Sequence, residues 1–461
     1  MEPIRRWWLR TPQREYEHIG PNEGDAGDTG FDGDGIQELN KFFETPFSWL
    51  EYLIFLWMGV SMLWAWNMFL AAAPYFLDRF ESNPWVVSNF QSSILSVSTL
   101  TNLTSVFILA KLQENASYPR RIRLSLIFSM IVCLLLALST VLLRGVSAMG
   151  YFVFLLVMVF AASMSTGMIQ NGVFAYVAGF GQERYIQAIM AGQGVAGVLP
   201  CIVQILSVLL ATSPVESSAA SPDRVQYQPY RSAFVYFGTA VCVSGIGLLS
   251  FIYLDRRHNL RITKAAASRA GLLEQEETDE REIPAKKSIP LHTLFTQLRW
   301  ASLAMFICFG VTMIYPVFAT KIYSVRISDQ RFRPAVFIPL AQLIWNIGDL
   351  LGRFILLLPH VDLSTYPFVL FIMSIARLGF IPLYMLCNIG GRGAVINSDA
   401  FYLVVVQLLF GVTNGYIGAS CMVSAAEWVA PEEKEAAGAF MSLMLVAGLT
   451  TGSFLSFLIK V

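Results

Sequence analysis

Two opposite charges lie four residues apart inside an otherwise apolar run, LIWNIGDLLGRFILLL. On a helix, Asp349 and Arg353 share one face and can neutralise each other, and Asn346 extends the same polar stripe. A carboxylate accepts from adjacent hydroxyls while a guanidinium donates to the same oxygens, which suits a sugar diol. The alternative is an ion pair that only locks helix packing. Intramembrane charges usually face an aqueous cavity, so we favour a pair that lines a solute pathway.

Two further apolar runs carry side chains suited to a planar ring. Gln170, in MSTGMIQNGVFAYVAG, has an amide that both donates and accepts, as reading the edge of a nucleobase requires. Its alternative role is a hydrogen bond between helices. In SMLWAWNMFLAAAPYF, Trp66 can stack on a ring and Asn67 can brace the backbone near a helix break. Trp64 and Trp66 can equally be packing or interface aromatics.

The elements that position these residues are long apolar segments. The chain has 461 residues, of which 55% are hydrophobic and 14% charged, whereas soluble domains hold about 25% charged residues. Stretches of about 20 apolar residues, enough to cross a bilayer, recur along the chain. They start near residues 50, 87, 124, 151, 188, 231, 298, 334, 366, 400 and 437. The sequence therefore predicts an all-α integral membrane protein of about eleven transmembrane helices.

The longest polar break, which begins at Asp255, divides the spans into six and five. Its charged sequence is typical of a flexible linker. We expect a disordered cytosolic tail (1–45), an N-terminal six-helix bundle (46–254), a cytosolic linker loop (255–297) and a C-terminal five-helix bundle (298–461). A cytosolic N-terminus places about twenty Lys and Arg on the cytosolic side, against about ten opposite. Two bundles around such a linker are the layout of major-facilitator-type transporters.

Several classes of function lack support in the sequence. The 32 basic and 32 acidic residues cancel, so no positive field favours nucleic acid. The six cysteines and four histidines lack metal-ligand spacing, and we expect no metal. Neither a P-loop nor a GxSxG, HExxH or paired catalytic carboxylate motif occurs in a suitable context, so we expect no enzyme and no cofactor.

Small residues gather in the fifth expected span, in the segment GQGVAG that holds Gly192 and Gly194. The ordinary purpose of such residues is close approach of two helix backbones, and the functional alternative is a helix contact that moves during transport. We favour packing.

Taken together, these segments resemble the equilibrative nucleoside transporter family, in order from the first span to the eleventh. The matching segments are WNMFLAAAPYF (66–76), YIQAIMAGQGVAG (185–197), WNIGDLLGR (345–353), IARLGFIPLYMLCN (375–388), NGYIGASCM (414–422) and EKEAAGAFMSLMLVAGLTTGSFLSF (433–457). Single short motifs occur by chance, whereas six in order do not.

The resemblance implies a pseudo-symmetric six-plus-five fold of major-facilitator type and facilitative transport of nucleosides, in some members also of nucleobases. It implies that Asp349 and Arg353 bind the ribose hydroxyls. It further implies that Gln170 reads the base, while Trp66 and Leu70 form the walls of the base pocket.

Other positions carry structural or gating roles in the resemblance. Asn67 and Asn346 match polar structural residues of the family, and Arg377 matches a residue that supports helix packing or gating rather than contacting substrate. One departure is Ala65, where the family often has a proline before the Trp-Asn pair.

We expect alternating access by a monomer that carries nucleosides such as adenosine and uridine passively across a bilayer. The expected location is a vacuolar, lysosomal or plasma membrane. The alternatives are a sugar or drug permease of the major facilitator superfamily, a proton-coupled nucleoside symporter, and a membrane receptor or scaffold that binds a nucleoside without moving it.

Overall fold

The structure is a computed structural model. It describes residues 47–112, 116–211, 229–273, 289–313, 315–319, 321–326, 332, 334–358 and 361–456. The expected tail over 1–45 and the side chain of Leu70 lie outside the described residues. Within the described ranges the chain is helical apart from turns, short connections and one isolated antiparallel bridge between Ile322 and Ile389.

The N-terminal half consists of long helices joined by tight connections. Local sequence sets where they begin: Pro84 opens α5 directly after Asn83, whose side-chain oxygen accepts from the backbone N–H of Val86 at 3.3 Å. Ser147 caps α7 by accepting from the backbone N–H of Gly150. The described helices are α3 (Trp49–Ala71), α4 (Ala73–Phe80), α5 (Pro84–Lys111), α6 (Tyr118–Leu142), α7 (Ala148–Gly179), α8 (Glu183–Ala211) and α9 (Pro229–Leu273).

The C-terminal half contains several interrupted helices. The segment from Pro367 to Met385 is α-helical on both sides of a 3-10 turn, and α16 follows directly on a π-helix. The described elements are α10 (Leu291–Gln297), α11 (Arg299–Thr312), α12 (Tyr315–Ala319), α13 (Pro334–Ile355), α14 (Pro367–Ala376), η2 (Arg377–Gly379), α15 (Phe380–Met385), η3 (Phe401–Leu408), α16 (Leu409–Glu427), η4 (Pro431–Glu433) and α17 (Lys434–Ser456).

Ten segments of the described chain are helices long and apolar enough to cross a membrane. Each coincides with one of the eleven expected spans. The remaining expected span is α13, a helix of 22 residues whose sequence carries Asn346, Asp349 and Arg353. The prediction of an all-helical, multi-pass membrane protein is therefore confirmed.

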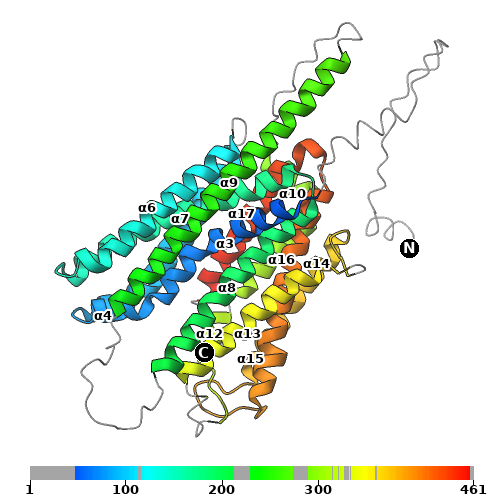
Figure 1. Cartoon of the computed structure of the whole chain (residues 1–461). Helices are drawn as coiled ribbons and strands as arrows, with labels where there is room; N and C mark the ends of the chain where they lie inside the picture. Colours follow the sequence, from blue (N-terminus) through cyan, green and yellow to red (C-terminus); the bar gives the residue numbers. More distant parts are fainter. Residues whose placement is uncertain are drawn as a thin grey trace, which may run out of the picture.

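The predicted linker loop differs from the structure at both of its ends. Helix α9 continues without a break to Leu273, and residues 291–297 form α10. The sequence from Asp255 onward, DRRHNLRITKAAASRAGLL, has no proline and is rich in Ala, Leu and Arg, which are strong helix formers even where they are charged. Charge therefore marked the end of the apolar span but not the end of the helix, and α9 projects past its neighbours (Figure 1).

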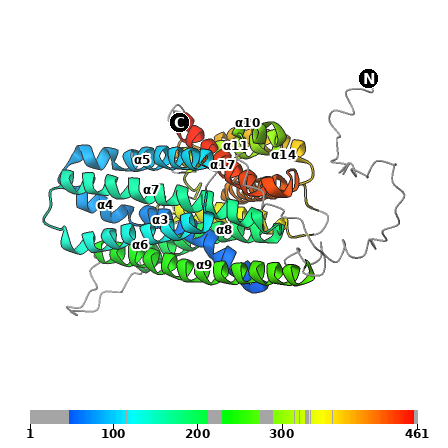
Figure 2. The ribbon, with the colours of Figure 1, turned by 90° about the horizontal axis from the view of Figure 1, so that it is seen from above.

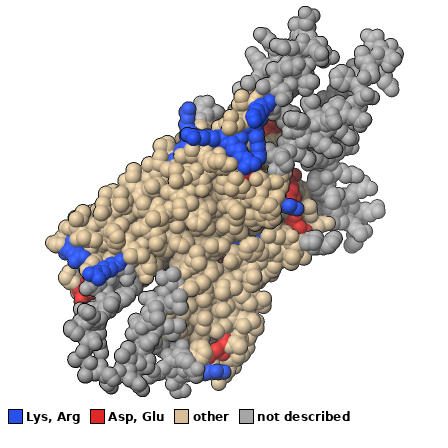
Figure 3. Space-filling model, in the orientation of Figure 1, with Lys and Arg blue, Asp and Glu red and all other residues tan. Residues whose placement is uncertain are grey.

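The two halves lie side by side and meet along a few helices. Seen from above, α5, α6, α7 and α9 lie on one side and α10, α11 and α14 on the other (Figure 2). Helix α8 of the first half packs on α13, and α17 of the second half packs on α5 and α7. On the face seen in Figure 3, uncharged residues cover the middle of the molecule, while Lys and Arg gather toward its ends, as a bilayer requires.

Glycines permit the closest helix contacts around α13. A Cβ added at Gly348 or Gly352 would lie 2.4 and 2.1 Å from carbonyl oxygens of the segment formed by η3 and α16. One added at Gly411 or Gly415 would lie 2.1 and 1.8 Å from carbonyl oxygens of α13. The two backbones therefore touch through a reciprocal pair of GxxxG spacings, which fixes the helix that carries Asp349 against α16.

Candidate functional site

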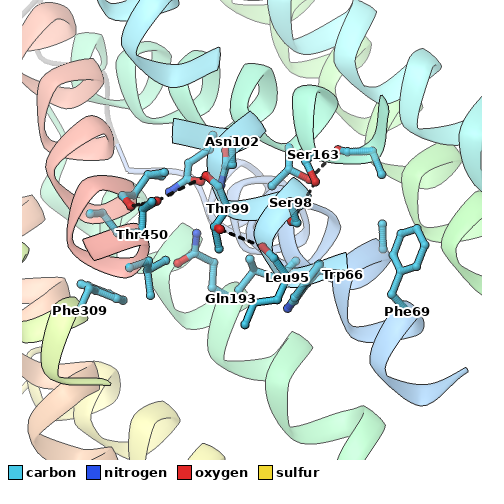
Figure 4. Close-up of a pocket in the computed structure, with 18 of the residues that line it drawn as sticks. Trp66, Phe69, Leu95, Ser98, Thr99, Asn102, Ser163, Gln193, Phe309 and Thr450 are labelled. Carbon is cyan, nitrogen blue, oxygen red and sulfur yellow. Dashed lines mark hydrogen bonds between the residues drawn. The ribbon is translucent and has the colours of Figure 1, made fainter. Parts of the chain in front are cut away.

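A cavity of about 220 Å³ lies between the two halves. Helices α3, α5, α7 and α8 contribute its wall on one side, and α11, α13 and α17 on the other (Figure 4). Twelve of the 21 lining side chains are apolar or aromatic and nine are polar or charged, a composition that suits a small molecule with both apolar and polar surfaces. The lining residues are Leu63, Ala65, Trp66, Phe69, Leu95, Ser98, Thr99, Asn102, Val159, Ala162, Ser163, Thr166, Gln170, Gln193, Phe309, Met313, Arg353, Leu445, Val446, Leu449 and Thr450.

The charged pair on α13 forms the ion pair that its spacing predicts. Arg353 Nε donates to Asp349 Oδ2 at 2.8 Å, and each residue is only 5% exposed. Arg353 lines the cavity, whereas Asp349 lies behind it and is not among the lining residues. The opposite charges of this buried pair offset each other, which reduces the cost of placing either group away from water.

Arg353 also connects the two halves. Its Nη1 atom donates to the backbone oxygen of Met190 at 2.5 Å and to Gln193 Oε1 at 3.3 Å, and both acceptors belong to α8. Gln193 itself lines the cavity and extends its amide toward Met62 Sδ at 3.2 Å. The guanidinium therefore lies at the cavity wall and, at the same time, in the contact between the halves.

The two residues expected to recognise a planar ring line the same cavity. Trp66, on α3, is half-buried, and Gln170, on α7, is 4% exposed. Both come from the N-terminal half, opposite Arg353. Leu70 follows one turn after Trp66 on α3, but its side chain lies outside the described residues.

The residues expected to be structural lie outside the cavity lining. Asn67 Nδ2 donates to the backbone oxygen of Ala196 at 2.7 Å and so joins α3 to α8. Asn346 Nδ2 donates to Gln342 O at 2.9 Å and lies 3.4 Å from Cys201 Sγ on α8.

Gly192 and Gly194 face different neighbours of α8. A Cβ at Gly192 would lie 1.9 Å from the backbone oxygen of Leu56 on α3. One at Gly194 would meet the side chain of Leu350 on α13 at 2.9 Å. The first contact lies within the N-terminal half, and the second lies between the halves.

Arg377 is the largest fully buried side chain of the described chain, 1% exposed, and lies at the turn between α14 and α15. It does not line the cavity. Its partners are the backbone oxygens of Cys308 and Phe410 and the side chains of Cys308, Thr312 and Asn414.

Sequence reasoning missed several polar residues of the site. Ser98, Thr99 and Ser163 line the cavity on the side of the N-terminal half, and the hydroxyls of Ser98 and Ser163 lie 2.8 Å apart. Hydroxyl residues are common in membrane helices, so their sequence gives little signal. Asn414 is a stronger case, because a 2% exposed amide inside an apolar span indicates a specific partner.

Comparison with known proteins identifies the family. A family model described as nucleoside transporter matches residues 156–461. The nucleoside transporter FUN26 of Saccharomyces cerevisiae is 31% identical over 444 residues, which cover 88% of this chain and 83% of the yeast protein. The chain belongs to the nucleoside transporter family. Equilibrative nucleoside transporter 1 of Homo sapiens is 26% identical over 464 residues, covering 89% of this chain and 96% of the human protein.

Solved structures with the same fold are major facilitator superfamily transporters. The proton:xylose symporter XylE bound to 6-bromo-6-deoxy-D-glucose aligns with a TM-score of 0.54 at 11% identity, over 88% of this chain and 86% of that chain. FucP in its outward conformation aligns with a TM-score of 0.50 at 14% identity, over 90% and 96%. These likenesses establish the major-facilitator fold of this nucleoside transporter family member, which is a transporter and not an enzyme.

Proposed function

We propose that this protein carries nucleosides across a membrane passively, by alternating access around the cavity between its halves. The observation that carries the proposal is the composition of the cavity wall. An aromatic ring, Trp66, and an amide, Gln170, come from one half, and a guanidinium, Arg353, comes from the other. A nucleoside has a planar base and a sugar diol, and these three groups match its two ends.

In this proposal the ribose hydroxyls bind at the pair on α13. Arg353 offers N–H groups at the cavity wall, and the Asp349 carboxylate lies one hydrogen bond beyond it, at 2.8 Å. A hydroxyl can then accept from the guanidinium and donate to the carboxylate. Gln170 reads the base edge, and Trp66 and Leu70 enclose the base.

The bridge from Arg353 to α8 suggests how binding promotes movement. The same Nη1 atom donates to Met190 O and Gln193 Oε1 across the contact between the halves. A substrate hydroxyl competes with these acceptors for the guanidinium. Occupancy of the site therefore weakens a contact that holds the halves together on this side, which favours rocking of one half against the other.

Passive flux follows from the charges of the site. Asp349 is the carboxylate beside the cavity among the described residues, and it is already paired with Arg353. Because this carboxylate already has a cationic partner, the site needs no further positive charge to balance it. A proton-coupled symporter would accumulate uridine above the external concentration when an inward pH gradient is imposed, whereas we expect equal concentrations at the plateau.

Uptake by proteoliposomes of purified protein tests the site. Because hydrogen bonds to charged groups contribute about 1.5 to 3 kcal/mol, Asp349→Asn and Arg353→Lys should raise the KM for uridine by about ten- to a hundredfold. Glu81→Gln, at an exposed position, is the matched control and should leave KM unchanged. Wild-type KM in both α13 variants would refute the sugar assignment.

The same vesicles separate the competing functions. Unlabelled adenosine should compete with labelled uridine, whereas competition by hexoses and not by adenosine would identify a sugar permease. Trans-acceleration of labelled uridine by internal uridine, known as counterflow, distinguishes transport from binding by a receptor or scaffold.

We also propose a monomeric unit with a cytosolic N-terminus in a vacuolar, lysosomal or plasma membrane. The bias of Lys and Arg supports the orientation. Light scattering of the detergent-solubilised protein tests the monomer, protease accessibility of an N-terminal tag in intact cells tests the orientation, and microscopy of a tagged chain identifies the organelle.

A further inference from the structure

Arg377 is a buried cation at the point where the ninth span changes from α-helix to 3-10 turn. Its Nη1 atom donates to Cys308 O at 2.7 Å, and its Nη2 atom donates to Thr312 Oγ1 at 3.2 Å and to Phe410 O at 3.4 Å. Its guanidinium carbon lies 4.5 Å from the centre of the Phe410 ring. Among the described residues it forms no ion pair, so this buried charge is held by carbonyls, a hydroxyl, a thiol, an amide and an aromatic ring.

Arg377 also fixes the orientation of an amide on α16. Asn414 Oδ1 accepts from Arg377 Nη1 at 3.1 Å and from Thr312 Oγ1 at 2.6 Å. A guanidinium can only donate, so this side of the amide must be its oxygen. The Nδ2 group therefore points the other way, where it donates to Asp349 Oδ1 at 2.6 Å.

The Asp349 carboxylate is consequently held from two directions. Oδ1 accepts from Asn414, and Oδ2 accepts from Arg353 Nε at 2.8 Å. Four side chains thus form a hydrogen-bonded row, Arg377, Asn414, Asp349 and Arg353, and each is at most 5% exposed. This row runs from the broken ninth span through α16 to α13 and ends at the cavity wall, because Arg353 lines the cavity.

We propose that Asn414 and Arg377 are positioning residues for substrate recognition: Arg377 sets the amide of Asn414, which orients Asp349 and, through it, the guanidinium of Arg353 at the cavity. This rests on the proposed binding of ribose hydroxyls at α13. Side chains outside the cavity then determine how strongly the transporter prefers a nucleoside over the analogue that lacks one sugar hydroxyl.

The test compares uridine with 3′-deoxyuridine as inhibitors of labelled uridine uptake in proteoliposomes. The ratio of their inhibition constants measures what the hydroxyl contributes, independently of how much protein is active. We expect wild type to prefer uridine by about tenfold or more, the size of one charged hydrogen bond. Asn414→Leu and Arg377→Gln should reduce the preference to less than about threefold.

Two further variants separate positioning from a structural role. Arg377→Lys keeps the charge and a donor toward Asn414, so it should retain more of the preference than Arg377→Gln. Ser374→Ala is the matched control, because it removes a buried hydroxyl one turn earlier that bonds the backbone oxygens of Ala304 and Leu370 at 2.9 Å. It can lower the maximal rate but should keep the wild-type preference.

A double variant tests whether the residues of this row act through one another. Asp349→Asn combined with Asn414→Leu should show no smaller preference than Asp349→Asn alone, because the second change acts through the first. If Asn414→Leu does not yield monodisperse protein, Asn414→Ser and Arg377→Gln carry the same comparison.

The outcomes distinguish this inference from the proposed function. Wild-type preference in the Asn414 and Arg377 variants, together with loss in Asp349→Asn, overturns the positioning role and leaves the ribose site intact. Equal inhibition of wild type by uridine and 3′-deoxyuridine overturns the contact with that hydroxyl, and the positioning role with it.

Discussion

Replacement of Gly415 by alanine should damage nucleoside recognition without touching a polar side chain. The added Cβ would lie 1.8 Å from the backbone oxygen of Asp349, whereas real Cβ atoms essentially never approach closer than 3.0 Å. Helices α13 and α16 must therefore move apart there by about 1.2 Å, the difference between these two distances. The hydrogen bond from Asn414 Nδ2 to Asp349 Oδ1, now 2.6 Å, would be lengthened beyond the 3.5 Å limit of hydrogen bonding.

The expected loss follows from that one bond. A hydrogen bond to a charged group contributes about 1.5 to 3 kcal/mol, equivalent to about ten- to a hundredfold in an equilibrium constant. We expect Gly415→Ala to raise the KM for uridine by a factor in this range, measured by uptake into proteoliposomes loaded with equal amounts of monodisperse protein.

Gly238→Ala on α9 is the matched control, because nothing lies within 4 Å of the Cβ it adds. It exchanges the same atoms in a helix interior, where alanine is favoured over glycine by about 1 kcal/mol, and should leave KM unchanged. If Gly415→Ala transports uridine with the KM of Gly238→Ala, the close contact of α13 with α16 does not position the site.

Three other predictions concern single side chains. Glu51 is 1% exposed, and its Oε1 atom lies 2.7 Å from Arg261 Nη1. Glu51→Gln should therefore lower the melting temperature in detergent by several degrees, while the exposed control Glu81→Gln should not. Equal melting temperatures of the two variants would contradict this. Trp66→Ala should weaken uridine inhibition about tenfold and Trp66→Phe much less, because a base still stacks on phenylalanine. Gln170→Leu should change the ratio of inhibition by adenosine and uridine, and an unaltered ratio would remove Gln170 from base recognition.

The apolar pattern predicted the helices well because a bilayer imposes the length and composition of each span. Expected starts near residues 50, 231 and 366 correspond to helices that begin at Trp49, Pro229 and Pro367. Hydropathy carries no information about what happens inside or beyond a span. The continuation of α9 to Leu273 and the π-helix from Phe401 depend on helix propensity and tertiary contacts instead.

The candidate site was predictable only where its chemistry is costly in a membrane. Asp349 and Arg353 stood out because charges in an apolar run need partners, and their spacing placed them on one face. The family resemblance indicated a packing or gating role for Arg377 but not what it contacts, because its carbonyl and amide partners come from two other helices, α11 and α16. Asn414 lies 65 residues from Asp349, so no local pattern connects them.

The two halves of the molecule contribute different kinds of side chain to the cavity wall. Trp66 and Gln170 belong to the N-terminal half, while the guanidinium of Arg353 belongs to the C-terminal half. Under the proposed function the base is therefore held mainly by one half and the ribose by the other. A nucleoside spans both halves, whereas a free base contacts chiefly one. In the same proposal, the row of hydrogen-bonded side chains behind Arg353 orients the ribose side of the site, and the hydrogen bond from Arg353 to α8 is the contact that a bound sugar replaces. Recognition and the release of one half from the other would then depend on the same guanidinium.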